Sequence, residues 1–482
     1  MKKKSLSKNA ILNALRTTLG IIFPLISFPY VSRILGVDNI GRFHFSYSIV
    51  TYAAVFAALG VHTYSIRECA KVRDDKMKLE KMASEIFSIN LVAAIITYII
   101  LIVLCFIVPK FAANRALIYV LSLEIIFTTV GCEWIYPVFE DYLYITLRTL
   151  GVYVLSMALL FAFVRTEQDL LKYAIVSSVS VCGAGLANLI GRRKLCRIRP
   201  TIHLNLKQHL TPILTIFMNT VTTTIYVNSD MLILGLMTSD TYTGLYTVSV
   251  RIYTIIKRIL AAVITVSVPR LARYWGAGDQ VRLKETCHKI FNVLLIVVTP
   301  AMVGLFAISK QVVLLIAGKS FADSRQSLQI LSIALLLSLF CWFFTSCILI
   351  PSKNEKKVLQ GTIAAALSNI ILNLVLIPYF QERAAALTTC IAEAVALGFG
   401  YFRSRKILRI HLNLRDVLSV IAGCALIFII CFITNFTIGE RTILTLAISI
   451  PASVIGYVGA LMLGKNKYAF EMLHTMIRKI KR

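Results

Sequence analysis

Long apolar runs separated by short polar segments dominate the chain. Each run reaches the ~18–20 residues that an α-helix needs to cross the hydrocarbon core of a bilayer, and no large polar domain interrupts the series. The pattern therefore predicts an all-α integral membrane protein with about 14 transmembrane helices. The expected spans lie near residues 10–34, 43–66, 86–108, 116–138, 144–164, 170–190, 211–237, 242–268, 290–309, 327–350, 362–379, 385–402, 417–437 and 442–463.

The loops between these spans alternate in charge. Basic segments such as 67–81, 191–200 and 403–415 fall on one side, together with both ends of the chain, whereas opposite loops such as 238–241 are short. Because lysine and arginine are enriched in cytoplasmic loops, both termini are expected in the cytoplasm. The first run lacks a small-residue cleavage site and is expected to remain as a span. The basic tail 473–482 is expected to lie on the inner leaflet.

An internal repeat relates the two halves of the chain. The segment GRFHFS begins at Gly41 and the segment GLYTVS begins at Gly244, so that both read Gly-x-aromatic-x-x-Ser and end at Ser46 and Ser249. The offset of 203 residues corresponds to six predicted spans. An even number of spans keeps both halves in the same orientation, which predicts a parallel repeat with its axis along the membrane normal. We expect two six-helix lobes, residues 1–200 and 201–410, followed by two further helices and the tail within 411–482.

The amino-acid composition is typical of a membrane protein, so the high positive net charge does not by itself indicate a nucleic-acid-binding protein. The chain is 58% hydrophobic and 15% charged, with a formal net charge of +28, whereas a soluble domain is about one quarter charged. Because the basic residues lie mostly in loops, we expect contact with anionic membrane lipids and no nucleic-acid partner. The eleven cysteines form no CxxC pair, so we expect reduced, buried thiols and no metal site.

Basic residues inside the predicted spans are the candidate substrate-binding groups. A charge at the centre of a span costs about 2.5–3.5 kcal/mol and therefore usually faces protein or a water-filled interior. Arg251 lies roughly 14 Å along its span, near the midplane, so it is expected to line a hydrophilic cavity, with a buried structural pair as the alternative. For the others, snorkelling to an interface competes with cavity lining and is the simpler explanation for Arg33. The full set is Arg16, Arg33, Arg251, Lys257 and Arg258.

Acidic residues in the spans have two interpretations. Glu124, Asp230 and Glu393 can pair with the arginines or take part in coupling to a cation. Glu133 lies close to the predicted cytoplasmic interface, where solvation is expected. Since basic residues outnumber acidic ones, the interior is predicted to suit an anionic substrate, with phosphate or diphosphate favoured because guanidinium groups match its oxygens.

The segment FPLISFPYVSRILG, at 23–36, combines two prolines with a charge. Pro24 and Pro29 each remove a backbone donor, which predicts a bend in the first span. A bend here would turn Arg33 toward the interior.

Motifs for catalysis are missing. The closest P-loop match ends at Gly318-Lys319-Ser320 but has Val313 where glycine is required, and there is no HExxH or GxSxG motif. The chain is therefore not expected to be an enzyme or to hold a resident cofactor. A coupling ion, H⁺ or Na⁺, is left open as the energy source.

Several blocks resemble the oligosaccharide-lipid flippases, or Wzx-like polysaccharide exporters. The most specific are FPYVSRILGVDNIGRFHFSYSIV at 28–50, GVHTYSIRECAKVRDDKMKLEK at 60–81, EWIYPVFED at 133–141 followed by Arg148, and SNIILNLVLIPYF at 368–380. The family's glycines before the Ala-Ala…Glu segment are replaced here by Gln381-Glu382-Arg383. The resemblance implies a MATE-like fold and alternating access with undecaprenyl-diphosphate-linked oligosaccharide as cargo. A polysaccharide polymerase and glycosyltransferases are the implied partners in the cell membrane.

Three alternatives stay open. A cation-coupled multidrug exporter of related fold would favour acidic rather than basic binding sites, and a lipid II flippase would carry a different cargo. A membrane glycosyltransferase or polymerase would need a sizeable catalytic loop, which the short predicted loops do not provide.

Overall fold

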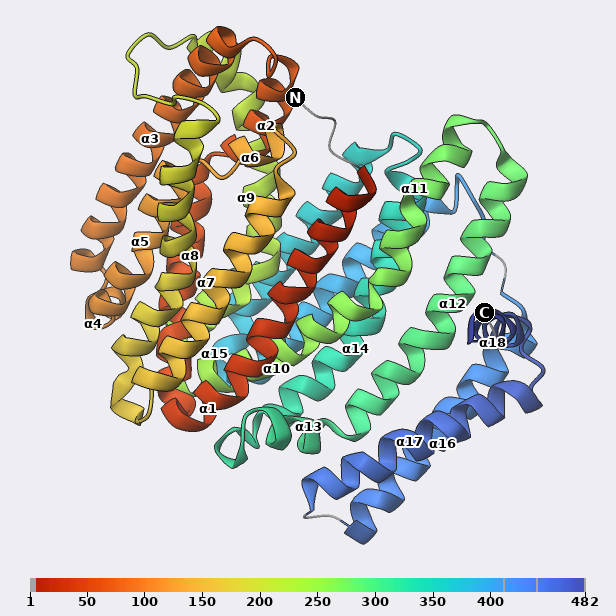
Figure 1. Ribbon diagram of the computed structural model, residues 1–482. Helices are drawn as coiled ribbons and strands as arrows, with labels where there is room; N and C mark the ends of the chain where they lie inside the picture. The colour runs from red at the N-terminus through yellow and green to blue at the C-terminus, as the bar shows by residue number, and fades with distance from the viewer. Residues whose placement is uncertain (1–5, 411, 439–440, 481–482) are drawn as a thin grey trace. The chain divides into compact units, whose positions relative to one another are not determined.

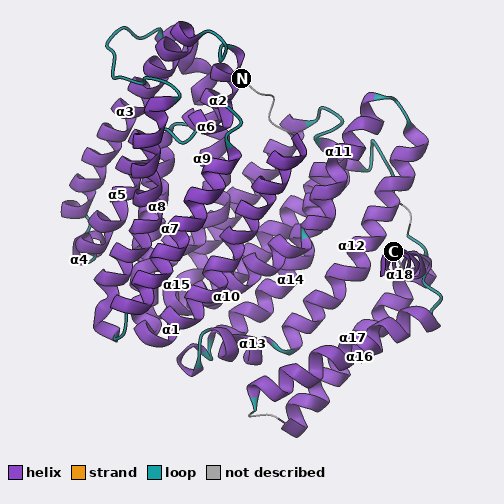
Figure 2. Ribbon diagram, in the orientation of Figure 1, coloured by secondary structure: helices purple, strands orange, loops and turns teal. Residues whose placement is uncertain are grey.

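The computed structural model describes residues 6–410, 412–438 and 441–480, which fold into helices with no strand among them (Figures 1 and 2). Met1–Ser5 and the last two residues of the basic tail, Lys481 and Arg482, lie outside the described residues. The helices are α1 (Leu6–Ala58), α2 (Val61–Lys71), α3 (Lys76–Ile107), α4 (Pro109–Ala113), α5 (Arg115–Gly131), α6 (Ile135–Val138), α7 (Tyr142–Phe163), α8 (Leu170–Gly191), α9 (Leu206–Met237), α10 (Asp240–Leu260), α11 (Ala262–Gly276), α12 (Gln280–Ala307), α13 (Ser309–Ile316), α14 (Ser324–Phe343), α15 (Glu355–Ser404), α16 (Leu414–Ile438), α17 (Thr442–Leu463) and α18 (Lys467–Ile480).

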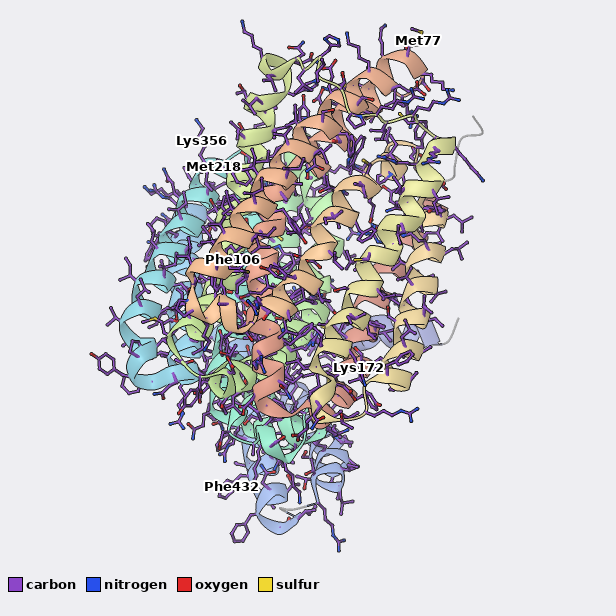
Figure 3. The ribbon with its side chains drawn as sticks, turned by 90° about the vertical axis from the view of Figure 1, so that its left-hand side faces the viewer. Met77, Phe106, Lys172, Met218, Lys356 and Phe432 are labelled. Atoms are coloured by element: carbon purple, nitrogen blue, oxygen red, sulfur yellow. The ribbon has the colours of Figure 1, made fainter. Side chains whose placement is uncertain are left out.

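Twelve helices in the described part of the chain are long and apolar enough to cross a membrane. Large apolar side chains project from their outer faces, as Phe106 and Met218 do in Figure 3. The sequence pattern predicts about 14 spans, and the difference arises because two pairs of expected spans are each joined in one continuous helical segment, α1 and α15. The number of membrane crossings therefore stays a prediction.

The segment α1 is a helical hairpin rather than a straight rod. In a straight helix, Phe28 and His44 would be roughly 24 Å apart along the axis, yet their ring centroids lie 6.5 Å apart. The chain reverses at Gly36, whose φ of 73° and ψ of 179° are the non-helical values within α1. Glycine adopts this positive φ without the steric penalty that a Cβ would impose.

The bend expected at the two prolines is a separate feature from this reversal and stays a prediction. Pro24 and Pro29 both lie inside α1, and the break in helical backbone geometry falls at Gly36 instead. Each proline removes one helical hydrogen bond, but reversal of the chain needs the conformational freedom of glycine. Arg33 lies three residues before the reversal, and its turn toward the interior stays a prediction.

The segment α15 is a second hairpin. Its chain reverses at Gln381, with φ of 46° and ψ of −125°. The two arms touch, because the Thr388 hydroxyl donates to Oδ1 of Asn373 and a methyl group placed on Gly361 would lie 3.1 Å from Cβ of Phe399. A non-glycine residue at this φ is strained, so the packing of the two arms must stabilise the turn.

The described residues divide into two compact units, one ending at Gly244 and the other starting at Leu245. The first has a hydrophobic core to which α2 contributes Tyr64, α3 contributes Ile86, and the turn before α6 contributes Trp134. In the second, α16 and α17 pack side by side (Figure 1), and the Tyr457 hydroxyl on α17 donates to the carbonyl of Ile296 on α12 at 2.7 Å. These two helices match the spans predicted at 417–437 and 442–463. The lobe boundaries at 200 and 410 stay predictions.

Repeat-equivalent segments meet within the first unit. A Cβ on Gly41 would overlap the carbonyl of Asp240, and a Cβ on Gly244 would overlap the carbonyl of Val37. Val37 and Asp240 are themselves 203 residues apart, as are the two glycines. Between them, the Thr241 hydroxyl donates to Oδ1 of Asp38 at 2.6 Å, and this pair has the same separation of 203. Reciprocal contacts of this kind are the signature of a local twofold relation, which supports the offset proposed from the sequence.

All eleven cysteines carry free thiols, and most of these are buried. Burial raises the pKa of the Cys196 thiol, in the loop after α8, to about 12. Such a thiol stays protonated and unreactive at neutral pH. Unfolding of this protein can therefore be followed by the reaction of newly exposed thiols with a fluorescent dye.

Gly41→Ala and Gly244→Ala are each expected to destabilise the protein by roughly 1–3 kcal/mol, because the added methyl group overpacks a backbone crossing that has no flexible side chain to move. Thermal unfolding of the purified protein in detergent, followed with a thiol-reactive dye, measures the effect. Gly151→Ala is the matched control, since nothing lies within 4 Å of the added Cβ. The control should unfold at the wild-type temperature or above it, because alanine favours a helix by about 1 kcal/mol over glycine. Equal melting temperatures for the wild type and the three variants would contradict the close backbone contacts at Gly41 and Gly244.

Candidate functional site

Three charged side chains meet in the first unit. Glu133, in the turn between α5 and α6, accepts from Nη2 of Arg16 at 2.9 Å and from Nη2 of Arg148 at 3.3 Å. The first arm of α1 brings Arg16 here because it lies along α7, where the Thr146 hydroxyl donates to the carbonyl of Leu12 at 3.2 Å. Two guanidinium groups and one carboxylate leave this cluster with a net positive charge. The expectation that Glu133 is merely solvated is therefore wrong.

Arg148 is a member of this cluster that the count of span charges missed. Its side chain is only 5% exposed, and it also donates to Oδ1 of Asn188 on α8. The signal was available in the sequence, because Arg148 lies within the span expected at 144–164. Applying the cost of a charge inside a span to every lysine and arginine would have selected it.

The other candidates in the first unit are dispersed. Arg33 is exposed at the end of the first arm of α1. Asp230, on α9, is buried, accepts from the backbone N–H of Met231 at 2.8 Å, and lies close enough to Tyr52 to interact with it electrostatically. Glu124, on α5, makes no salt bridge within the described ranges. Of the three candidate carboxylates, Glu393 forms a salt bridge, whereas the pairing explanation does not cover Glu124 within the described residues.

A second charged cluster lies in the second unit. Lys257 on α10 donates to Oε1 of Glu393 on α15 at 2.9 Å and to the Tyr253 hydroxyl at 3.0 Å. The Tyr253 hydroxyl in turn donates to the same carboxylate oxygen at 3.3 Å. The Glu393 side chain is 8% exposed and that of Lys257 is 27% exposed. Glu393 is therefore paired, as one of its two interpretations required, but with a lysine rather than with an arginine.

Helical geometry separates the basic residues of α10 into two faces. Tyr253 and Lys257 are four residues apart and share the face that meets Glu393. Arg251 and Arg258 are seven residues apart, close to two full turns, so they share another face. Arg251 is half-buried and Arg258 is exposed. An anionic group that spans more than one helical turn could contact both guanidinium groups of this second face.

The structure thus brings together Lys257 with Glu393, and Arg16 with Glu133 and Arg148. Among the residues that it describes, no group of three or more histidine, cysteine, aspartate or glutamate side chains is arranged to hold a metal ion. Only the cluster of Arg16, Arg148 and Glu133 contains guanidinium groups, and its excess positive charge suits the binding of an anion.

Comparison with known proteins identifies relatives in membrane transport. The family described as "Polysaccharide biosynthesis protein" matches residues 6–275. The "Putative O-antigen transporter" of Escherichia coli (strain K12) is 22% identical over 420 residues, which cover 84% of this chain and 99% of that protein.

Solved structures show the same architecture. A structure of the lipid II flippase MurJ in an inward closed conformation has a TM-score of 0.74 at 15% identity and covers 94% of this chain and 99% of its own. An inward-facing MATE multidrug resistance transporter has a TM-score of 0.60 at 15% identity, covering 83% and 98% respectively. These likenesses confirm the predicted all-α, MATE-like fold class.

Glu393→Gln is expected to destabilise the protein by roughly 2 kcal/mol, because Lys257 is left as a largely buried charge without its counter-ion. The double variant Lys257→Met with Glu393→Met should recover at least half of this loss, since an apolar pair replaces the ion pair without an orphaned charge. Thermal unfolding of the purified variants, followed with the thiol-reactive dye, measures both. Additive destabilisation in the double variant would show that the two side chains are not energetically coupled.

Proposed function

Because the chain belongs to the polysaccharide biosynthesis protein family, we propose that it is a flippase that moves undecaprenyl-diphosphate-linked oligosaccharides across the cytoplasmic membrane. The single observation that carries this proposal is the family match, which extends over more than half of the chain. The relative described as an O-antigen transporter supports a role in making a surface polysaccharide, which can be a capsule, an exopolysaccharide or an O-antigen. This role is transport rather than catalysis.

The proposed mechanism is alternating access. The polar head of the cargo, built on the cytoplasmic leaflet, enters the interior of the protein while its polyprenyl tail stays in lipid. The diphosphate is bound by Arg251 and Arg258, whose shared face on α10 offers two guanidinium forks, with Arg16 and Arg33 as further contacts along the path. Lys257 is held by Glu393 and contributes mainly by fixing α10 against α15. Movement of one lobe against the other then exposes the head outside.

The energy source and the partners complete the proposal. A coupling ion, H⁺ or Na⁺, would use Glu124 or Asp230, and Glu124 is the better placed for protonation because it makes no salt bridge in the described part of the chain. Glycosyltransferases supply the cargo on the cytoplasmic side, and a polysaccharide polymerase consumes it outside. Both termini are cytoplasmic in this scheme.

A lipid II flippase is the second candidate function, favoured by the TM-score of 0.74 to MurJ. A multidrug exporter is less suited, because α10 carries three basic residues, Arg251, Lys257 and Arg258, whereas a cationic drug would favour acidic side chains at its binding site. Two assays separate these functions. Deletion of the gene should cause lipid-linked oligosaccharide to accumulate and should abolish the surface polymer, and expression of the chain should fail to rescue cells depleted of their lipid II flippase.

Arg251→Ala is expected to reduce export of the polymer about tenfold or more, because a charge-assisted hydrogen bond to the diphosphate is worth about 1.5–3 kcal/mol. Arg251→Lys should restore only part of the loss, since it keeps the charge but not the planar fork. Surface polymer is measured in a deletion strain that expresses each variant, with protein abundance determined in parallel. Arg273→Ala, at an exposed position on α11, is the matched control and should export normally. Normal export by Arg251→Ala at normal abundance would remove Arg251 from the mechanism.

Reporter fusions test the sidedness. Fusions after residues 200 and 410 are expected to report a cytoplasmic location, and a fusion after residue 240 an external one, because of the charge difference between the two sets of loops. Alkaline phosphatase and a fluorescent protein are the paired reporters, active outside and inside respectively. The reverse pattern at all three positions would invert the topology and with it the proposed direction of transport.

A further inference from the structure

A pocket of about 510 Å³ lies in the second unit, where the ends of α12, α13, α14 and α16 meet. Its wall contains two cationic side chains, Lys310 and Arg325, and three amide side chains, Gln311, Gln329 and Asn435. Phenylalanine rings complete the lining. None of these residues is part of the charged clusters described above.

The polar residues of the pocket lie within two residues of the same predicted end of each span that contributes to it. The contributing residues fall at 306–311, 325–329 and 428–435, which are the ends of three spans expected at 290–309, 327–350 and 417–437. By the alternation of loop charge, each of these ends is on the external side. The site is therefore placed at the outer membrane–water interface, where lipid head groups lie.

A chain of amide hydrogen bonds leaves one buried acceptor unused. Nδ2 of Asn435 donates to the carbonyl of Ala307 at 3.3 Å, which directs Oδ1 of Asn435 toward Gln311. Nε2 of Gln311 must then be the donor, and it lies 2.6 Å from that oxygen. Among the described residues Oε1 of Gln311 consequently has no hydrogen-bond partner, although Gln311 is only 4% exposed. A buried acceptor of this kind costs about 1–3 kcal/mol unless a ligand supplies an O–H or N–H donor.

The two cations of the pocket have no acidic partner in the part of the chain that the structure describes. Neither Lys310 nor Arg325 forms a salt bridge within residues 6–410, 412–438 and 441–480, whereas Lys257 and Lys289 of the same unit do. Ammonium and guanidinium groups in this position attract a phosphate, to which they form charge-assisted hydrogen bonds. The polar part of the pocket thus suits a ligand with two groups: a phosphate for Lys310 and Arg325, and a hydrogen-bond donor for Oε1 of Gln311.

The remaining wall is apolar and open toward the surrounding lipid. Phe428 and Phe432, four residues apart on α16, are 47% and 64% exposed, and Figure 3 shows Phe432 projecting away from the helices. A ring surface of this kind at the interface suits the first carbons of a lipid chain rather than a free, fully hydrated ion.

We propose that this pocket binds a lipid head group that carries a phosphate and a hydroxyl or ammonium donor. Lys310 and Arg325 bind the phosphate, Oε1 of Gln311 accepts from the donor, and the tail lies along Phe428 and Phe432. The chemistry is shared by a glycerophospholipid and by a lipid-linked sugar diphosphate at the outer leaflet. The proposal does not rest on the transport function, because its test is binding alone.

Native mass spectrometry of the purified full-length protein provides the test. Phosphatidylethanolamine and phosphatidylcholine with identical acyl chains are the probes, since both carry a phosphate and no net charge but only the former has an N–H donor. The wild type should bind phosphatidylethanolamine about fivefold to tenfold more tightly, as expected for one added hydrogen bond. Gln311→Leu should abolish this preference, and Lys310→Gln with Arg325→Gln should weaken both lipids about tenfold.

The matched control replaces Arg115 and Lys319 by glutamine. Both are exposed and lie on the predicted external side, so the change in charge is equal but lies outside the pocket, and lipid binding should be unaffected. Because Lys310 and Arg325 are also exposed, their variant should fold normally even if Gln311→Leu does not, and thermal unfolding without lipid checks this. Equal binding of both lipids by the wild type, or equal losses in the pocket and control variants, would overturn the proposal.

A competition identifies the source of the head group. A polyprenyl-diphosphate-linked N-acetylhexosamine is added to protein loaded with phosphatidylethanolamine. Displacement from the wild type, but not from the Lys310 and Arg325 variant, would support the lipid-linked sugar as occupant. Retention of phosphatidylethanolamine would support a phospholipid at the same site.

Discussion

The hydrocarbon core of a bilayer offers no hydrogen-bond partner to a peptide group, and this constraint shapes the whole chain. Every backbone N–H and C=O that crosses the core must be satisfied within the protein, which helices do by themselves. The described residues accordingly fold into helices, and the reversals within α1 and α15 take place in single residues, Gly36 and Gln381. A reversal that short exposes few peptide groups. The price is backbone strain at Gln381, which the contact between the arms of α15 offsets.

The same medium decides where charges can lie. An isolated ion in a span is costly, and five of the charged side chains there form salt bridges: Lys257 with Glu393, and Arg16 and Arg148 with Glu133. Pairing changes the role that a charged residue can have. Lys257 is held by a buried carboxylate and a tyrosine hydroxyl, so it mainly joins α10 to α15 and is less available to bind a substrate. Arg251 and Arg258 lie on another face of α10 than Lys257, and their guanidinium groups differ from its ammonium group in offering planar, forked donors.

Small residues give the repeat its physical basis. Helices in lipid gain nothing from apolar burial alone, and close backbone approach at glycine is one of the ways in which they associate. Gly41 and Gly244 permit such an approach, and their contacts are reciprocal, each meeting the carbonyl four residues before the other. The Gly-x-aromatic-x-x-Ser motif thus marks a packing element, with its serines buried beside it, and is not a substrate-binding signature.

The amino-acid sequence alone was enough to predict an all-helical membrane protein, the location of its spans and the repeat of 203 residues. The sidedness of the spans stays a prediction from loop charge. These properties follow from hydropathy, loop charge and spacing, which are one-dimensional. Only the tertiary structure decided which charges pair, because Arg16 and Glu133 are 117 residues apart and Lys257 and Glu393 are 136 apart. It also decided that the chain reverses between the first two expected spans at Gly36, and that Gln311, Asn435 and Arg325 line one pocket. Side-chain partners of this kind depend on how helices distant in the sequence pack, and local patterns carry no record of that packing.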